Sequence, residues 1–213
     1  MDNDAYLEEG ALKHLAEVFA VKNCAHVVAL NIIDSRTGKS ETEGYKSDSC
    51  VFHGAAVAMK KSVADALGGY NKDYFIMHTD LELSTRLLNS GYSIYYDKGI
   101  IAFHSRSEVS RLGSSAIFYA TRNAFSYYWK YYPYLYAFIL SLREVVYGLA
   151  RAERERGLRY FFKGLFFGLI RVPRSLNNRV LLKQDVFLRM KQYIDSSFRQ
   201  PVIRKVLSGF KER

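Results

Sequence analysis

The fold of this chain is decided by the segment His78-Thr79-Asp80-Leu81-Glu82-Leu83-Ser84-Thr85-Arg86-Leu87. Thr79 is followed three residues later by Glu82 and then by apolar residues at helical spacing, which is the pattern of a capping box at a helix N-terminus. Gly91 supplies a stop signal. The segment therefore predicts a helix with Asp80 in its first turn.

Asp80 has two explanations. The helix dipole and the unpaired amides of the first turn favour an acidic side chain there whatever the function. A carboxylate held at the start of a helix can also serve as a general base. The elements on either side of the helix bear on this choice.

Those elements form an ordered set. Upstream are a small-residue strand at 54–61, a short helix that ends at Gly68-Gly69-Tyr70-Asn71, and an aromatic turn at Tyr74-Phe75. Downstream are an alternating strand at 92–96, a turn at 97–99, and an apolar run at 100–103 that ends at His104.

In this order the elements resemble the acceptor half of a family-2 glycosyltransferase of the GT-A fold, in the rhamnosyltransferase-like branch. That family has a glycine-led strand, a Gly-Gly-aromatic turn, an acidic pair opening a helix, an arginine six residues later, and a histidine after the next strand. The resemblance extends from the first residues to about residue 125 and implies that Asp80 is the general base. Thr79 departs from the pattern, because the family has glutamate there.

A D-x-D motif, Asp2-Asn3-Asp4, stands at the start of the chain. Two carboxylates at this spacing can point the same way and hold a hard divalent cation that binds diphosphate oxygens. Acidic segments also supply the motif by chance. In the family a D-x-D precedes the acceptor half, so the resemblance implies that Asp2 and Asp4 hold Mg²⁺ or Mn²⁺ as a cofactor.

Two further residues are site candidates through the resemblance. A histidine closing an apolar strand is ordinarily structural, but the family position makes His104 a candidate to complete the metal site or to contact the donor diphosphate. Arg122 lies in a segment that resembles an Arg-Asn pair found after the catalytic domain of this branch, and it is a candidate to bind diphosphate. A salt bridge, or snorkelling from an interfacial helix, is the alternative for Arg122.

The other histidines, His14, His26 and His53, have no partner at ligand spacing, so we expect them to be surface or core residues. We expect a strand at 26–33 and a polar, irregular loop at 38–50. An amphipathic helix is expected directly after the D-x-D, with one face made of Leu7, Ala11, Leu15, Val18 and Phe19.

The predicted fold class is α/β, a partial GT-A (Rossmann-like) domain with a helical C-terminal extension. Residues 1–113 would form the C-terminal part of the GT-A domain, and residues 114–213 a basic, aromatic-rich extension. In the family the nucleotide-binding half precedes the D-x-D, so the resemblance implies that the chain lacks it. The segment 105–115 is predicted to be a loop that could close over the donor.

The extension is expected to be helical at 116–132, 134–150, 159–171 and 181–198, with Pro133 as a helix break. Arg143 and Glu144 interrupt the apolar run of the second helix, so no transmembrane helix is predicted. The segment 159–171 combines an apolar face with flanking cations. That pattern fits a helix lying in lipid headgroups or one packed in a core.

Charge is distributed unevenly. Residues 1–104 contain 10 Lys+Arg and 14 Asp+Glu, whereas residues 105–213 contain 21 and 7. The second half is therefore a basic surface suited to an anionic partner such as phospholipid or a nucleoside diphosphate. Nucleic acid is not expected, because no recognisable reading motif is present.

Only two cysteines occur, Cys24 and Cys50, and no signal peptide is predicted. A reducing compartment is expected, with the protein cytoplasmic and peripheral at the inner face of the cell membrane. The resemblance implies inverting transfer of a sugar from a nucleotide-sugar to a glycan or lipid-linked acceptor in polysaccharide synthesis. The alternative is a non-catalytic membrane-surface module derived from such an enzyme.

Overall fold

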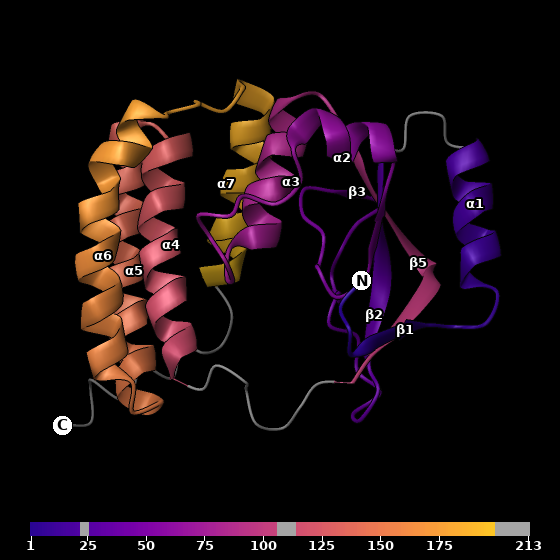
Figure 1. Ribbon diagram of the computed structural model, residues 1–213, viewed down its shortest axis with the longest axis horizontal. Coiled ribbons are helices and arrows are strands. Elements are labelled where there is room, and N and C mark those ends of the chain that lie inside the picture. The colour runs from indigo at the N-terminus through magenta and orange to yellow at the C-terminus, as the bar shows by residue number, and fades with distance from the viewer. Residues whose placement is uncertain (22–25, 106–113, 199–213) are drawn as a thin grey trace. The chain divides into compact units, whose positions relative to one another are not determined.

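The computed structural model describes residues 1–21, 26–105 and 114–198, which fall into two compact units (Figure 1). One unit is drawn from Met1–Phe75 and Thr79–Arg111, and the other from Ile76–His78 and Leu112–Arg213. The first contains the β-sheet and the second is helical, so the predicted α/β class is confirmed. The predicted boundary after residue 113 borders a segment outside the described residues and stays a prediction.

The first unit contains one mixed sheet of five strands together with helices. β5 pairs in parallel with β2 along one edge, and its other edge pairs antiparallel with β3 near its start and with β1 at its end. β4 pairs antiparallel with the far edge of β2. The strands are β1 (Ala5–Leu7), β2 (Val27–Asp34), β3 (Asp48–Ser49), β4 (Val57–Met59) and β5 (Ile94–His104).

The turn predicted at 97–99 proves to be a bulge inside β5, so the expectation of two separate strands was wrong. Leu30 of β2 pairs with Asp97, but the next residue, Asn31, pairs with Ile101. The Asn31 amide donates to the carbonyl of Lys98 (3.2 Å), so the partner strand supplies a bond to the bulged backbone. As a result the strand continues to His104.

The helix expected directly after the D-x-D begins later than predicted. Leu7 lies in strand β1, and α1 spans Ala11–Val21. The edge of β5 recruits residues 5–7 as a strand, and Gly10, at φ 80°, turns the chain into the helix. Leu7, Leu15 and Phe19 nevertheless pack against the same core cluster as Ala11 and Val18, so the predicted apolar set is correct in burial although Leu7 was wrong in secondary structure.

The predicted helices around Asp80 are confirmed. α2 (Lys61–Leu67) ends at Gly68, which is left-handed, and α3 (Thr79–Asn89) starts at the predicted threonine. Gly91, at φ 85°, ends α3, with its N–H bonded to the carbonyl of Leu88. Asp80 therefore lies in the first turn of α3.

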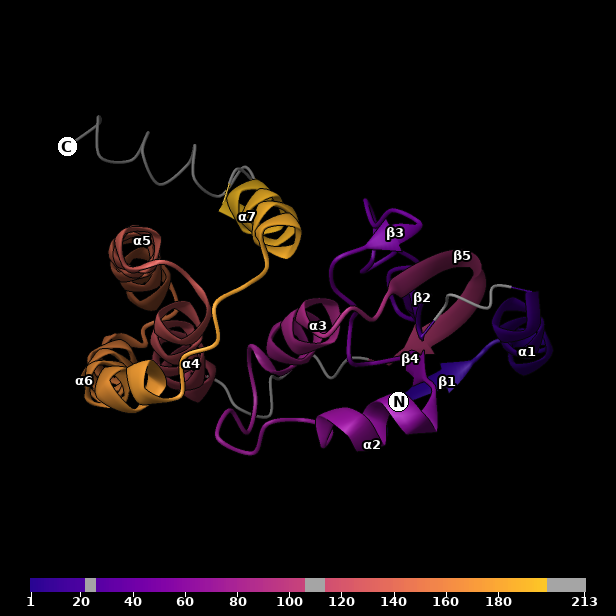
Figure 2. The same ribbon diagram turned by 90° about the horizontal axis from the view of Figure 1, so that it is seen from above.

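Four helices make up the described part of the second unit, and α4, α5 and α6 lie side by side (Figures 1 and 2). α6 packs closely on α4. Gly164 lies so near α4 that a Cβ there would stand 2.7 Å from the carbonyl oxygen of Phe118. Pro133 separates α4 from α5, as predicted. The helices are α4 (Ser115–Tyr131), α5 (Tyr134–Arg154), α6 (Leu158–Asn177) and α7 (Gln184–Phe198).

Within the described ranges, no helix combines the length and the apolar character needed to cross a bilayer.

Candidate active site

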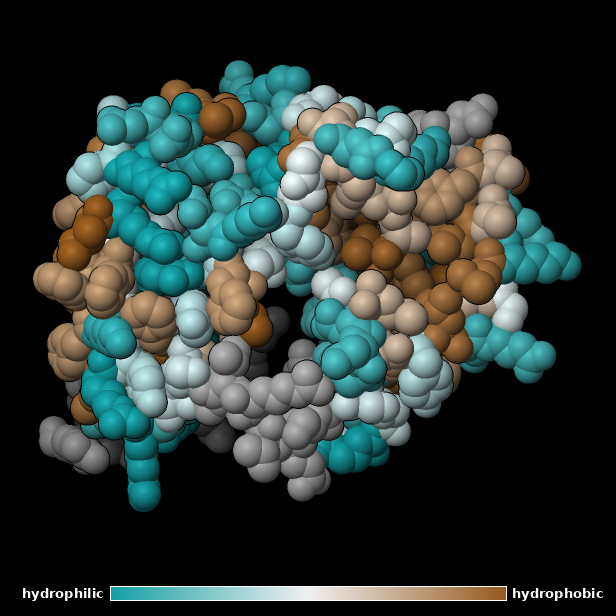
Figure 3. Space-filling model, in the orientation of Figure 1, coloured by the Kyte–Doolittle hydropathy of each residue, from teal (hydrophilic) through white to brown (hydrophobic). Residues whose placement is uncertain are grey.

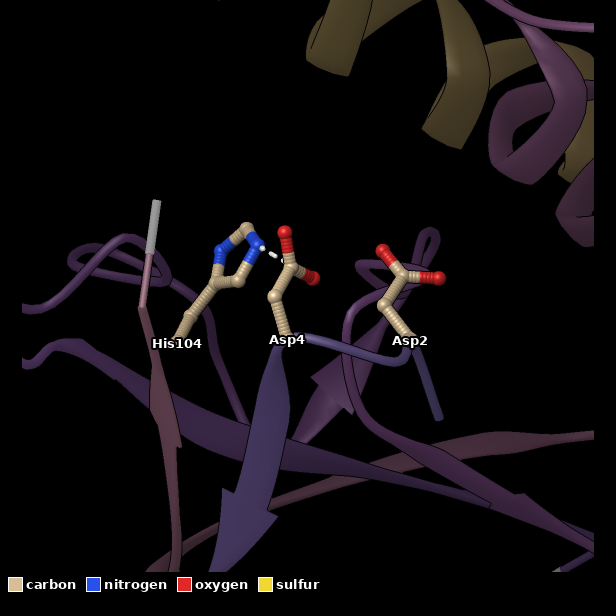
Figure 4. A group of neighbouring side chains, drawn as sticks. All are labelled: Asp2, Asp4 and His104. Carbon is tan, nitrogen blue, oxygen red and sulfur yellow. Dashed lines mark ion pairs between the residues drawn. The ribbon is translucent and has the colours of Figure 1, made fainter. Parts of the chain in front are cut away.

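Asp2, Asp4 and His104 come together at one end of the sheet (Figure 4). One ligand-type atom from each of the three lies within 4.8 Å of the others. His104 is the last residue of β5 and pairs with Ala5 of β1, which brings the residue before Ala5 beside it. The Asp4 carboxylate lies 3.5 Å from His104 Nε2.

The backbone at Asp2 is held by the segment that leads into β4. Its N–H donates to the carbonyl of Ala55 (2.9 Å), just ahead of β4. The pairing of β1 with β5 places Asp4, and this bond places Asp2. The structure therefore brings together the three residues that the resemblance selected as metal ligands, while the bound metal itself stays a proposal.

Glu41 joins this cluster, and sequence reasoning missed it. Its Oε2 lies 3.1 Å from His104 Nδ1 and 3.4 Å from His53 Nε2. This contact suits a proton on Nδ1 of His104, while Nε2, on the other side of the ring, faces Asp4. Glu41 lies in the polar loop predicted at 38–50, 63 residues from His104, and no motif marks it.

The donor set suits a divalent cation. Carboxylate oxygens are the ligands of Mg²⁺ and Mn²⁺, and an imidazole nitrogen is a ligand of first-row transition metals. A carboxylate behind the ligand histidine is the usual support in protein metal sites, because it fixes the tautomer and the ring orientation. Asp2, Asp4 and His104 therefore fit the expected cation, with Glu41 behind His104.

Asp80 lies against the glycine that opens the β4 segment. Its Oδ2 accepts a 2.8 Å hydrogen bond from the N–H of Gly54, and its Oδ1 accepts one from the Tyr70 hydroxyl (3.2 Å). A Cβ at Gly54 would stand 2.6 Å from Oδ1, closer than real Cβ atoms come. Glycine at 54 is thus what allows this carboxylate to approach the backbone.

The phenol of Tyr70 is influenced by both Asp80 and Asp2. Desolvation of the half-exposed phenol, and then the charges of Asp80 and Asp2, raise the pKa of Tyr70 well above its usual range. The hydroxyl therefore stays protonated and donates to Asp80. The charge of Asp2, a member of the cluster, acts on the same phenol as that of Asp80.

The second acidic residue of α3 has a structural role. Glu82 is fully buried and accepts hydrogen bonds from Arg86 Nε (2.9 Å) and Asn71 (3.3 Å). It is not part of the cluster of Asp2, Asp4 and His104. Arg86 also donates to the carbonyls of Leu67 and Gly69 at the end of α2. The arginine six residues after Asp80 therefore ties α3 to α2.

Arg122 belongs to the second unit and contacts its neighbours on α4. Its Nε donates to Asn123 Oδ1 (2.9 Å), and its guanidinium lies 4.9 Å from the centroid of the Tyr119 ring. Asn123 in turn donates to the carbonyls of Ile76 (2.7 Å) and Met77 (2.9 Å). These contacts show Arg122 orienting Asn123, and diphosphate binding by Arg122 stays a prediction.

Two of the remaining histidines take the roles expected of surface or core residues. His14 lies 3.7 Å from Asp97, and His26 shares a 3.0 Å hydrogen bond with Ser93. His53 differs, since through Glu41 it reaches the network behind His104. Most of the loop predicted to close over the donor, residues 106–113, lies outside the described residues.

Comparison of the chain with models of known protein families and with curated proteins finds no match.

Proposed function

We propose that this chain carries the metal-binding and acceptor-side parts of an inverting glycosyltransferase, which moves a sugar from a nucleotide-sugar to a hydroxyl of a glycan or lipid-linked acceptor. The observation that carries the proposal is the convergence at residues 54 and 55. Ala55 holds the backbone of Asp2, and Gly54 holds the carboxylate of Asp80. A candidate cation site and a candidate base are thereby fixed by adjacent residues.

Asp80 has the geometry of a general base. The hydrogen bonds from Gly54 and Tyr70 fix the position of its carboxylate, which is partly exposed. In the proposed reaction Asp80 takes the proton of the acceptor hydroxyl. The acceptor oxygen then forms a bond to the anomeric carbon, and the bond from that carbon to the diphosphate oxygen breaks.

The cluster would serve the leaving group. Asp2, Asp4 and the Nε2 of His104 would hold Mg²⁺ or Mn²⁺, which when bound neutralises charge that develops on the departing diphosphate. With the Nδ1 proton of His104 bonded to Glu41, Nε2 would be directed toward Asp4 and the cation. The fixed backbone of Asp2 keeps the first carboxylate beside them.

Metal binding is measured on the chain itself by Mn²⁺ electron paramagnetic resonance. We expect one site, weakened by Asp2→Asn and by Asp4→Asn, and bound more tightly when a nucleoside diphosphate is added. As controls, Asp48→Asn and Asp73→Asn remove exposed carboxylates elsewhere in the first unit and should leave the site intact. Equal Mn²⁺ binding by the cluster variants and the controls would refute the metal assignment.

Turnover is measured in a fusion of the chain to the nucleotide-binding half of a GT-A glycosyltransferase. With Mn²⁺ and lipid-linked acceptors, we expect transfer that needs both the metal and Asp80. Transfer that persists after chelation and in Asp80→Asn would overturn the proposal.

A further inference from the structure

Helix α6 exposes a continuous apolar stripe. Residues at four-residue spacing lie along one side of a helix, and four of them on α6 are apolar with exposed fractions of 42, 57, 60 and 57%. These residues, here called the α6 stripe, are Leu158, Phe162, Phe166 and Ile170. In Figure 3 apolar side chains appear among hydrophilic ones along the edge that α6 occupies in Figure 1.

Packing within the second unit does not account for the α6 stripe. The side of α6 that faces α4 is made of Phe161, Gly164 and Gly168, which are buried. A Cβ at Gly168 would stand 3.2 Å from the Phe125 side chain, so the helices meet through these small residues. α6 is thus apolar on two sides, and the second side faces outward.

A basic row runs beside the α6 stripe. Arg159 and Lys163 each follow one residue after a member of the stripe, and Arg171 continues the row. The exposed Arg159 and Lys163 lie over aromatic rings, at 4.7 Å from the Tyr160 centroid and 5.6 Å from the Phe118 centroid. Helix α6 contains four cations and no Asp or Glu.

Neighbouring α5 differs in its charges. Arg143 is 2.6 Å from Asp195, and Arg151 is 3.0 Å from Glu155, so these α5 cations are matched by acidic side chains. On α6, Arg159 and Lys163 stand next to exposed apolar residues of the α6 stripe. A positive row beside exposed phenylalanines complements a surface that offers anionic groups at the edge of an apolar layer.

We propose that the α6 stripe and its basic row dock on the surface of an anionic phospholipid bilayer, with α6 parallel to the membrane plane. The phenylalanines enter the boundary between headgroups and acyl chains, and Arg159 and Lys163 meet lipid phosphates. This inference does not depend on the proposed catalytic role. It gives the helical unit a function of its own.

The test is co-sedimentation of the purified chain with vesicles of phosphatidylglycerol and phosphatidylcholine, compared with phosphatidylcholine alone. We expect binding to the anionic vesicles, falling steeply between low and high salt, because the attraction extends over about one Debye length. Phe162→Ser together with Phe166→Ser should weaken binding by about tenfold or more, since each buried phenylalanine contributes through its apolar area. Arg159→Gln with Lys163→Gln should weaken it by about tenfold or more as well.

Matched controls come from the first unit. Leu12 and Lys13 of α1 are exposed like the α6 residues, so Leu12→Ser and Lys13→Gln should leave vesicle binding unchanged. Circular dichroism checks that each variant is folded. Unchanged binding by both α6 variants, or equal binding to neutral vesicles at high salt, would overturn the proposal.

A second copy of the chain is the competing occupant of the stripe. Sedimentation velocity without lipid distinguishes the two, because the bilayer proposal expects the same oligomeric state for wild type and for the Phe162→Ser, Phe166→Ser variant. A concentration-dependent dimer that this variant abolishes, in a protein that does not bind anionic vesicles, would assign the stripe to self-association.

Discussion

The N–H of Gly54 donates a 2.8 Å hydrogen bond to Oδ2 of Asp80, and the missing Cβ of Gly54 is what makes room for that carboxylate. Because the φ angle of Gly54 lies outside the left-handed region, alanine is compatible with its backbone. The obstacle to a side chain at 54 is therefore steric and specific to Asp80.

Gly54→Ala is expected to displace the Asp80 carboxylate. The clashing atoms are the end of a side chain that can rotate, so the main stability cost is the lost Gly54–Asp80 hydrogen bond, about 0.5–1.5 kcal/mol of unfolding free energy. Moving a catalytic group by about 1 Å can lower turnover about 100-fold. Urea unfolding and the transfer assay measure the two effects. In an Asp80→Ala background the same substitution should cost little stability, because the clashing atoms are gone; a full cost there would show that the clash lies elsewhere.

Asp80→Asn separates a base from a helix-start residue. Asparagine can still accept the bond from Gly54, so loss of the helix-dipole interaction should cost about 0.3–1 kcal/mol of stability. If Asp80 is the base, the rate constant should fall by about 10²–10⁴-fold with metal binding unchanged.

Glu82→Gln is the matched control two residues along α3. Glu82 is buried against Arg86, so this change should lower stability by about 1–3 kcal/mol while turnover changes little. If Glu82→Gln abolished turnover and Asp80→Asn retained it, the assignment of the base to Asp80 would be wrong.

Much of the fold could be predicted from local sequence signals. The breaks at Gly68, Gly91 and Pro133 follow from turn preferences that act within a few residues. α3 starts at Thr79 as predicted, but the expected capping box does not form, because Glu82 bonds Arg86 and Asn71 and the Thr79 hydroxyl donates to Asp80. β1 could not be predicted this way. Residues 5–7 become a strand because the edge of β5 is available, and that edge exists only after the chain has folded.

In the candidate site too, the residues marked by local motifs were predicted and those placed by long-range contacts were not. Asp2, Asp4 and His104 were selected from a D-x-D and a strand-end histidine, and the β1–β5 pairing brings them together. Glu41 carries no local signal, and the Gly-Gly-aromatic turn that contains Tyr70 does not indicate that its hydroxyl bonds Asp80. Each acquires its role from a contact distant in sequence, which periodicity and spacing do not encode.

Glu41 offers a test of the support behind His104. Glu41→Ala removes the acceptor of the Nδ1 proton and should weaken Mn²⁺ binding by about 10–100-fold, as loss of such supporting groups does in metal sites. Isothermal titration with Mn²⁺ measures the change. Glu43→Ala alters an exposed glutamate in the same loop and should have no effect; wild-type affinity in Glu41→Ala would remove Glu41 from the site.

Asn123 offers a test of the segment before α3. Its amide bonds two carbonyls in a stretch where Met77 and His78 have φ values of 63° and 60°, which non-glycine residues rarely adopt. Asn123→Asp replaces the donor with an acceptor and should cost about 1–3 kcal/mol or more. Asn178 also donates to a carbonyl but at the surface, so Asn178→Asp should stay within about 0.5 kcal/mol. Equal unfolding free energies for both variants would contradict the anchoring role.

Glu144 on α5 predicts how the stability of the helical unit depends on pH. Burial raises the pKa of Glu144 to about 8 from its ordinary value of 4.5, although the charge of Arg151 and a hydrogen bond with Thr121 act in the opposite direction. Between about pH 4.5 and 8 the native state therefore keeps a proton that the unfolded chain releases. The free energy of unfolding should fall as pH rises through this window and level off above it.

Glu144→Gln removes the titrating group and keeps a side chain that can bond to Thr121. The variant should gain on the wild type with rising pH, by up to about 1.4 kcal/mol per pH unit inside the window. Urea unfolding at pH 5 to 9 measures the difference, with Glu153→Gln, an exposed glutamate on the same helix, as a control that should run parallel to the wild type. A constant difference between Glu144→Gln and the wild type across this range would mean that Glu144 is ionised in the native state. In that case water reaches the carboxylate, and burial does not control its proton.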